Sequence, residues 1–279
     1  MILRLGNHEL MLDRPRVMGV LNVTPDSFSD GGLFLAASDA ATQAAAMVES
    51  GADIIDVGGE STRPGAPPVP VQEELDRVIP VVEAIAASHD VQISVDTSKS
   101  DVMDAAVSAG ATMINDVRAL REPGALEAAA RLDVAICLVH MQGSPADMQK
   151  NPRYNELPED IIAFLRGRVD ACVTAGIARD RLSVDPGFGF GKNDHHNLLI
   201  LARLDAFQAL GLPILVGLSR KRTLGNLTGR PVGERAPAGI AAAVMAIERG
   251  AHIIRTHDVR ETVDALRVVR AALEAGRSE

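Results

Sequence analysis

The chain has 279 residues, of which 47% are hydrophobic, so it is long enough to bury a sizeable core. A formal net charge of −9 argues against a general nucleic-acid binder, because phosphate backbones are bound by clustered Lys and Arg. Cys137 and Cys172 provide neither a disulfide framework nor a CxxC metal spacing, and no apolar run reaches signal-peptide or membrane-spanning length. We therefore expect a cytoplasmic globular protein without a nucleic-acid or membrane partner.

Short apolar runs of strand length recur along the chain, and each is uninterrupted, as in strands that are buried on both faces. Eight such runs are found, at residues 17–21, 53–57, 91–95, 112–115, 134–139, 182–185, 214–218 and 251–256. They predict the strands of a parallel sheet.

Amphipathic helices are predicted between these runs. One apolar stripe comprises Leu75, Val78, Ile79, Val82, Ile85 and Ala86, and the stripe of a closing helix comprises Val259, Val263, Leu266, Val269 and Leu273. Strict alternation of strand and helix, in a chain near the usual ~250 residues, predicts an α/β fold with a single (β/α)₈ TIM barrel over residues 1–279. A doubly wound open sheet is the alternative.

Two connections lack the composition of regular structure because they are rich in Gly, Pro, Ser and Asp. Residues 24–35 contain PDSFSDGG and follow the first strand, and residues 58–71, GGESTRPGAPPVPV, follow the second. We predict that both are long mobile loops at an active site, where loops of this length are expected.

Polar residues stand where the apolar runs end. They are Asn22, Asp56, Asp96, Asn115, His140, Asp185, Ser219 with Arg220 and Lys221, and Arg255 with His257. In a barrel these strand ends converge on one mouth, where such enzymes place their chemistry. Asp and Asn also cap helices, but caps do not require cations such as Lys221 and Arg255. A convergent polar site is therefore the favoured interpretation.

These residue types suit two kinds of ligand group. A flat heterocycle with an amino-pyrimidinone edge fits the donors and acceptors of Asp96, Asn115, Asp185 and Lys221. An anionic leaving group held with a hard cation such as Mg²⁺ fits Asn22, Arg255 and His257. Ordinary ion pairs and core hydrogen bonds remain alternatives for every one of them, because the types alone are not specific.

Longer blocks are more specific than single residues. They are MGVLNVTPDSFSDGG at 18–32, DIIDVGGESTRPGA at 53–66, ISVDTSK at 93–99, MINDV at 113–117, LVHMQGSPADMQ at 138–149, DPGFGFGK at 185–192, LVGLSRK at 215–221 and IIRTHDV at 253–259. In this order the set resembles the dihydropteroate synthase family over nearly the whole chain.

The resemblance implies a reaction in folate biosynthesis. Enzymes of that family condense 6-hydroxymethyl-7,8-dihydropterin diphosphate with 4-aminobenzoate, giving 7,8-dihydropteroate and pyrophosphate, and sulfonamides mimic the second substrate. It also implies Mg²⁺ as cofactor and a homodimer joined through the outer helices of the last βα units, which include the Ala-rich segment 236–246.

The resemblance also implies residue roles. The pterin would be bound by Asp96, Asn115, Asp185 and Lys221. The diphosphate and Mg²⁺ would be held by Asn22, Arg255, His257 and Arg63, with Asn22 as the metal ligand. The 4-aminobenzoate pocket would comprise Thr62, Pro64, Phe190, Ser219 and Lys221, with Phe28 closing it. Catalysis would depend on Lys221, Arg255, His257 and Arg63.

Two other functions remain as alternatives. A pterin-binding barrel of the methyltransferase type would share the Asp96, Asn115 and Asp185 group, but it would not need TPDSFSDGG, SRK or RTHD. A non-catalytic paralogue would be expected to have lost loop or anion-site residues. The GxGxG spacing within 187–191 predicts a tight turn and not a nucleotide loop.

Overall fold

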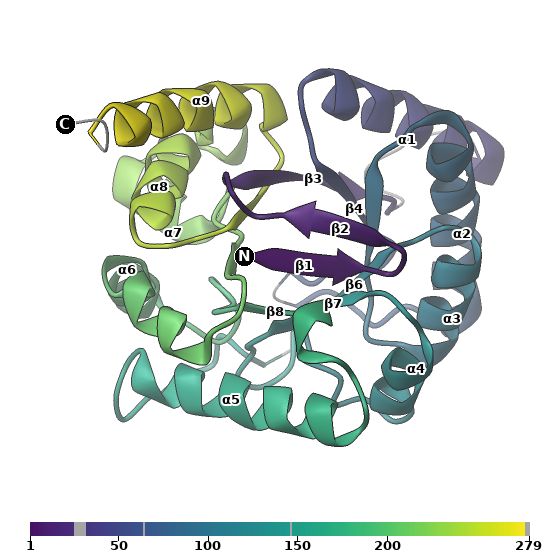
Figure 1. The fold of residues 1–279 in the computed structure, drawn as a ribbon, viewed down its shortest axis with the longest axis horizontal. Helices are drawn as coiled ribbons and strands as arrows, with labels where there is room; N and C mark the ends of the chain where they lie inside the picture. Colours follow the sequence, from purple (N-terminus) through teal and green to yellow (C-terminus); the bar gives the residue numbers. More distant parts are fainter. Residues whose placement is uncertain (25–31, 64, 146, 277–279) are drawn as a thin grey trace.

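The computed structural model describes residues 1–24, 32–63, 65–145 and 147–276, with the backbone alone for residues 32–37. Within this part of the chain, eight parallel strands form a barrel in the order β8-β7-β6-β5-β4-β3-β10-β9 (Figure 1). A bridge between Val184 and Ile214 joins the two end strands and closes the ring. The predicted barrel is confirmed, and the open sheet is excluded. The strands are β3 (Arg16–Asn22), β4 (Ile54–Gly58), β5 (Gln92–Asp96), β6 (Met113–Asp116), β7 (Ala135–Val139), β8 (Leu182–Asp185), β9 (Leu215–Val216) and β10 (Ile253–Thr256).

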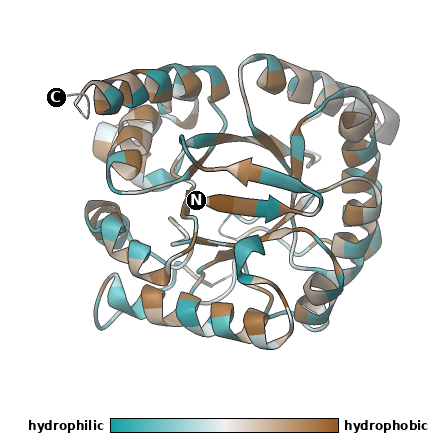
Figure 2. Ribbon diagram, in the orientation of Figure 1, coloured by the Kyte–Doolittle hydropathy of each residue, from teal (hydrophilic) through white to brown (hydrophobic). Residues whose placement is uncertain are grey.

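Helices surround the barrel and show both hydrophilic and hydrophobic residues, as amphipathic helices do (Figure 2). They are α1 (Gly32–Glu49), α2 (Val71–Ser88), α3 (Ser100–Ser108), α4 (Ala125–Arg131), α5 (Glu159–Thr174), α6 (Asp194–Ala202), α7 (Arg222–Thr228), α8 (Ala236–Glu248) and α9 (Val259–Ala275), with the short 3₁₀ helices η2 (Arg179–Arg181), η3 (Leu204–Leu210) and η4 (Val232–Glu234). None of the described helices is both long enough and apolar enough to span a bilayer.

Three details of the predicted helices and loops were wrong. Leu273 was expected to pack α9 against the sheet, but its residue is 46% exposed, because α9 runs past the barrel after the buried Leu266. The first predicted loop was expected to reach residue 35, whereas α1 begins at Gly32. Ala86, at the end of the α2 stripe, is exposed as well, whereas Val78, Val82 and Ile85 of that stripe are fully buried.

A hairpin that we did not predict closes one end of the barrel. Strands β1 (Ile2–Leu5) and β2 (His8–Met11) pair antiparallel through a Gly6–Asn7 turn, and Gly6 has the positive φ of 64° that such turns require. Leu3, Leu5 and Leu10 join an apolar cluster with the inward side chains at the first residues of the barrel strands. Figure 1 shows the hairpin crossing the barrel. The carboxyl ends of the barrel strands, which carry the predicted polar residues, therefore lie at the opposite end.

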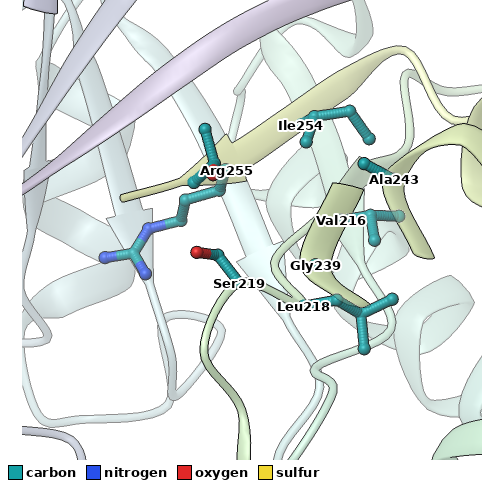
Figure 3. A pocket seen from close by; sticks show the side chains of 8 residues that line it. Val216, Leu218, Ser219, Gly239, Ala243, Ile254 and Arg255 are labelled. Carbon is teal, nitrogen blue, oxygen red and sulfur yellow. The ribbon is translucent and has the colours of Figure 1, made fainter. Parts of the chain in front are cut away.

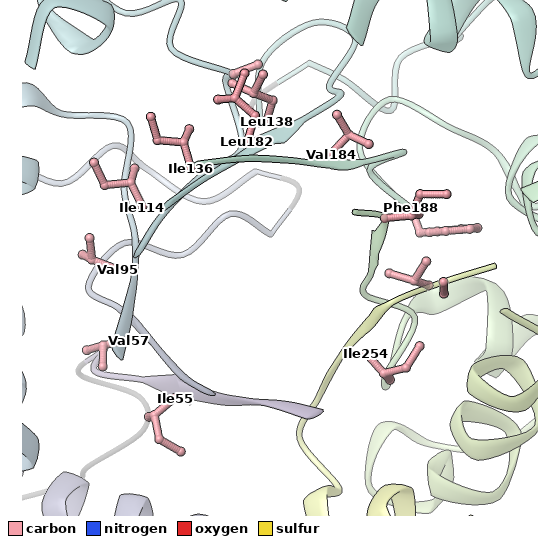
Figure 4. Close-up of a cluster of buried hydrophobic side chains, with 14 of the residues drawn as sticks. Ile55, Val57, Val95, Ile114, Ile136, Leu138, Leu182, Val184, Phe188 and Ile254 are labelled. Carbon is pink, nitrogen blue, oxygen red and sulfur yellow. The ribbon is translucent and has the colours of Figure 1, made fainter. Parts of the chain in front are cut away.

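The main apolar cluster lies between strands and helices. Figure 4 shows Ile55, Val57 and Val95 turned away from the barrel axis, with Ile114, Ile136 and Ile254 on the other strands doing the same. Successive side chains in a strand point to opposite faces, so the residues between these positions point into the barrel. This alternation determines which strand-end residues can meet.

Candidate active site

The inward positions near the strand ends carry the predicted polar residues. Asp56 lies between outward-facing Ile55 and Val57, and Asp96 follows outward-facing Val95. In the sheet register Asp96 pairs with Asn115 on β6, and Val139 pairs with Asp185 on β8. Fold and register thus place residues that are far apart in sequence around one mouth.

An ion-pair network centred on Arg255 occupies the floor of this mouth. Arg255 Nε donates to Asp56 Oδ2 at 2.6 Å, and Arg255 Nη2 donates to Asp96 Oδ2 at 2.9 Å. Asn115 Nδ2 also donates to Asp56 Oδ2, at 3.2 Å. The Asp56 side chain is 0% exposed, and those of Asp96 and Arg255 are 14% and 19% exposed.

This network links two groups of residues that the sequence analysis assigned to different parts of a ligand. Arg255 and Asp96 were assigned to separate groups, one for an anion and one for a heterocycle, whereas the structure joins them directly. Asp56 was recognised only as a strand-end residue, yet its carboxylate holds both Arg255 and Asn115. Its position among the other strand-end residues was the available signal for such a role.

Burial is the main influence on the pKa values of Asp96 and Asp185. Burial raises the pKa of Asp96 to about 7, although the Arg255 guanidinium opposes this. Burial also raises the pKa of Asp185 to about 6, against the Gly187 N–H, which donates to Asp185 Oδ1 at 2.6 Å. Burial works against the charge of Arg255 too, but Asp56 and Asp96 keep its pKa above the ordinary value. The floor therefore has a permanent cation beside carboxyls that titrate near neutral pH.

Lys221 lies beside this floor, at the start of α7. Its Nζ is 4.2 Å from the centroid of the Phe190 ring. Burial, followed by the charge of Arg255, lowers the Lys221 pKa to about 8, while Asp185 and Asp96 act in the opposite direction. The structure thus brings Lys221 and Phe190 together, as the predicted shared site requires.

Ser219 and His257 form the rim over strands β9 and β10. Ser219 Oγ is 3.1 Å from His257 Nδ1, and the His257 backbone N–H donates to Ser219 Oγ at 3.2 Å. Burial, together with Arg255 and Arg220, lowers the pKa of His257 to about 3, so the ring is neutral at physiological pH. Figure 3 shows the Ser219 hydroxyl and the Arg255 guanidinium turned away from the apolar side chains that line a small pocket under α8. The rim therefore offers a hydroxyl and a neutral imidazole beside the Arg255 guanidinium.

The remaining predicted residues lie on or beside the two long loops. Asn22 is half-buried at the end of β3, where it pairs with Gly58 in the register. Thr62 is half-buried and Arg63 is exposed on the loop after β4. Phe28 and Pro64 lie outside the described residues, so their predicted places in the pocket are not tested.

The donor set fits a Mg²⁺ ion only if a ligand supplies most of its coordination. No group of three or more His, Cys, Asp or Glu side chains suited to a metal occurs in the described parts of the chain. Asn22 can offer one amide oxygen, and Mg²⁺ is commonly bound by one or two protein oxygens together with phosphates and water. The residues fit an ion that arrives with a phosphorylated substrate.

The chain is similar to a family model and to several known proteins. Residues 18–257 match the family of pterin binding enzymes. Escherichia coli K12 dihydropteroate synthase is 54% identical over 266 residues, which are 95% of this chain and 94% of that protein. Yersinia pestis dihydropteroate synthase in a sulfonamide drug complex has a TM-score of 0.93 at 52% identity, covering 100% of both chains. Xanthomonas albilineans dihydropteroate synthase with 4-aminobenzoic acid has a TM-score of 0.92 at 51% identity, covering 98% of each chain. The chain therefore belongs to the dihydropteroate synthase family.

Proposed function

We propose that the barrel mouth carries out the reaction of this family, the condensation of 6-hydroxymethyl-7,8-dihydropterin diphosphate with 4-aminobenzoate. The observation that carries the proposal is the buried Arg255 network with Asp56 and Asp96, flanked by Asp185 and Lys221. An ion pair that only stabilised the fold would not require carboxyl groups with raised pKa values at the open end of the barrel. Groups with perturbed pKa values are typical of functional sites.

The pterin ring binds against the floor. Its amino-pyrimidinone edge presents parallel N–H donors, which a carboxylate such as Asp96 accepts through both oxygens. Asn115 Oδ1 is buried and has no partner among the described residues, so it provides a further acceptor. Asp185 and Lys221 complete the ring contacts with one acceptor and one donor. Because the floor is buried, leaving any of these ring groups unpaired would be costly, which selects for a pterin.

The diphosphate binds at the rim formed by Ser219 and His257. Barrels frequently bind phosphate through the loops after their seventh and eighth strands, which here are β9 and β10. Neutral His257 would contribute a hydrogen bond, while positive charge comes from Arg255 and from Arg63 on the second loop. Asn22 would hold Mg²⁺, and that ion, when bound, supplies further neutralisation of the diphosphate charge.

Bond breaking at the pterin methylene needs this charge neutralisation most. The C–O bond to diphosphate breaks, the electron pair leaves with the diphosphate, and the pterin ring stabilises the resulting cation. The 4-aminobenzoate nitrogen then forms the new C–N bond and loses a proton to solvent. Arg255, His257 and Arg63 stabilise the departing charge, so no strong general base is required.

The second substrate binds between the rim and the loops. Phe190, Ser219 and Lys221 form its fixed walls, and Thr62, Pro64 and Phe28 complete the pocket when the connections from β3 to α1 and from β4 to α2 close. Closure would keep water from the pterin cation, so that the weakly basic arylamine attacks in its place.

Arg63→Ala is expected to uncouple the two ligand sites. Arg63 lies four residues after Gly59 on a Gly- and Pro-rich loop and has an exposed side chain, so diphosphate bound by Arg63 would restrict the conformations of this loop. A sulfonamide titrated into wild-type protein should bind at least about tenfold more tightly with pyrophosphate and Mg²⁺ than without them, a coupling of roughly 1.4 kcal/mol. The variant should lose this difference. Equal affinity in wild type with and without pyrophosphate would indicate a preformed pocket.

Other features support the proposed assembly and location. Leu227, Val232, Met245 and Val268 are 57%, 55%, 39% and 70% exposed on α7, η4, α8 and α9, which supports a homodimer through the outer helices of the last units. Cys137 and Cys172 are buried free thiols, which fits a reducing cytoplasm. We treat residues 1–279 as one domain, since the N-terminal hairpin packs into the barrel core.

Pyrophosphate release is the direct test of this function. With pterin diphosphate, 4-aminobenzoate and Mg²⁺ present, we expect one pyrophosphate for each dihydropteroate formed, and almost none when 4-aminobenzoate is omitted. Release that does not depend on the arylamine would indicate a hydrolase. No release, with the pterin still bound, would indicate the non-catalytic alternative.

A further inference from the structure

A buried lysine that has no part in the proposed chemistry lies behind the site. Lys192 is 1% exposed. Its Nζ is 2.8 Å from His140 Nδ1 and donates to Gly187 O at 2.9 Å, Phe190 O at 3.0 Å and His140 O at 3.3 Å. Burial lowers the pKa of Lys192 well below its ordinary value. Such a group is retained only where its hydrogen bonds are needed, because an unpaired buried amine is costly.

The carbonyl partners of Lys192 belong to the turn that carries Phe190. This turn, residues 187–191, packs unusually closely on the segment after β7: a Cβ at Gly187 would lie 1.9 Å from His140 O, and one at Gly191 would lie 2.4 Å from Gln142 O. Both glycines have positive φ, 71° and 65°. The turn can therefore approach the neighbouring segment this closely only with glycine at these positions. Lys192 Nζ links the two segments through its hydrogen bonds to carbonyl groups of both.

The outer face of the same turn contacts Lys221. A Cβ at Gly189 would be 3.3 Å from Lys221 Cδ, and the Phe190 ring centroid is 4.2 Å from Lys221 Nζ. The Phe190 backbone is thus bonded to Lys192 on one side while its ring contacts Lys221 on the other. By contrast, Asp185 is the last residue of β8 and its carbonyl accepts from the His140 N–H within the barrel, at 2.9 Å.

We propose that Lys192 is a positioning residue that holds the 187–191 turn so that Phe190 forms the fixed wall of the 4-aminobenzoate pocket. This rests on the proposed function, which assigns Phe190 to that pocket. The pterin contacts depend less on Lys192, because Asp96 and Asn115 lie on strands β5 and β6, and Asp185 is part of strand β8 and contacts the turn only through the Gly187 N–H. The consequence is a selective defect: loss of the Lys192 amine should affect arylamine binding more than pterin binding.

Lys192→Met tests this, since it removes the amine and retains an unbranched side chain. We expect the KM for 4-aminobenzoate to rise about tenfold and the KM for pterin diphosphate to rise less than about threefold, as for a displaced pocket wall. Lys192→Met in a Phe190→Leu background should cause no further rise, because both changes act on one wall.

Arg181→Met is the matched control. Arg181 is a buried cation, 5% exposed, whose Nε donates to Val134 O at 2.8 Å and whose Nη2 donates to Ala129 O at 3.2 Å, both in segments that precede β7. It should lower the thermal midpoint without changing the ratio of the two KM values. If Lys192→Met, still folded, raises both KM values equally or neither, Lys192 is merely structural and the proposal is wrong. If Phe190→Leu leaves the 4-aminobenzoate KM unchanged, the assignment of the pocket itself fails.

Discussion

Asp96→Asn is expected to weaken pterin diphosphate binding by roughly 100-fold or more. The buried ring edge would lose an ionised acceptor for two hydrogen bonds, each worth about 1.5–3 kcal/mol when one partner is charged. The substitution also removes one of the two carboxylates that neutralise Arg255, which lies 2.9 Å from Asp96. Isothermal titration of the pterin into both proteins measures the difference. Asp101→Asn, an exposed change on α3, is the matched control and should bind normally.

The pH dependence of this binding provides a second measurement. Burial raises the Asp96 pKa to about 7, and the ring edge needs the ionised carboxylate. As the pH falls through 7, protonation of Asp96 should therefore weaken wild-type binding, while Asp96→Asn should lack this step. For the ligand-free protein the sign is opposite, because a raised carboxyl pKa favours folding at low pH and that contribution is lost as the pH rises through 7. Unchanged pterin affinity in Asp96→Asn would remove Asp96 from the site.

Lys221→Met is expected to impair both substrates, with kcat/KM falling by roughly 10–100-fold for each. The ammonium lies near Asp185 and Asp96, which oppose the lowering of its pKa, and 4.2 Å from the Phe190 ring. Loss of a charged hydrogen-bond donor of this kind costs about 1.5–3 kcal/mol. The measurement is steady-state kinetics with each substrate varied in turn.

The control for that variant is Lys150→Met, because Lys150 is an exposed lysine. It should leave both kcat/KM values unchanged. A defect of Lys221→Met confined to 4-aminobenzoate would contradict the shared role and would leave the pterin to Asp96, Asn115 and Asp185 alone.

The barrel was predictable because its signals are local. Each strand is an uninterrupted apolar run, and the stripe of α2 at Val78, Val82 and Ile85 follows helical spacing, so neither depends on distant residues. The N-terminal hairpin also has a local signal, the Gly6–Asn7 turn between alternating apolar residues. The end of the α9 stripe failed at Leu273, because periodicity does not indicate where a helix leaves the sheet.

The contacts within the site were less predictable than its composition. Strand ends identified Asp96 and Arg255, but their ion pair joins residues 159 positions apart and exists only once β10 pairs with β3 and the ring closes. The role of Asp56, 199 positions from Arg255, has the same origin. The burial of Lys192 could not be predicted for another reason. A lysine after a glycine-rich turn is usually solvated, and only the close packing of Gly187 against His140 buries this one.

Ligand density in crystals soaked with pterin diphosphate and Mg²⁺ tests the central claim most directly, namely that one barrel mouth binds the pterin on its buried floor and the diphosphate on its rim. We predict the amino-pyrimidinone edge against Asp96, Asn115 and Asp185, with the diphosphate beside Ser219 and His257 and Mg²⁺ within reach of Asn22. A pterin bound away from Asp96, or a diphosphate directed toward Asp185 with the ring at the rim, would contradict the account.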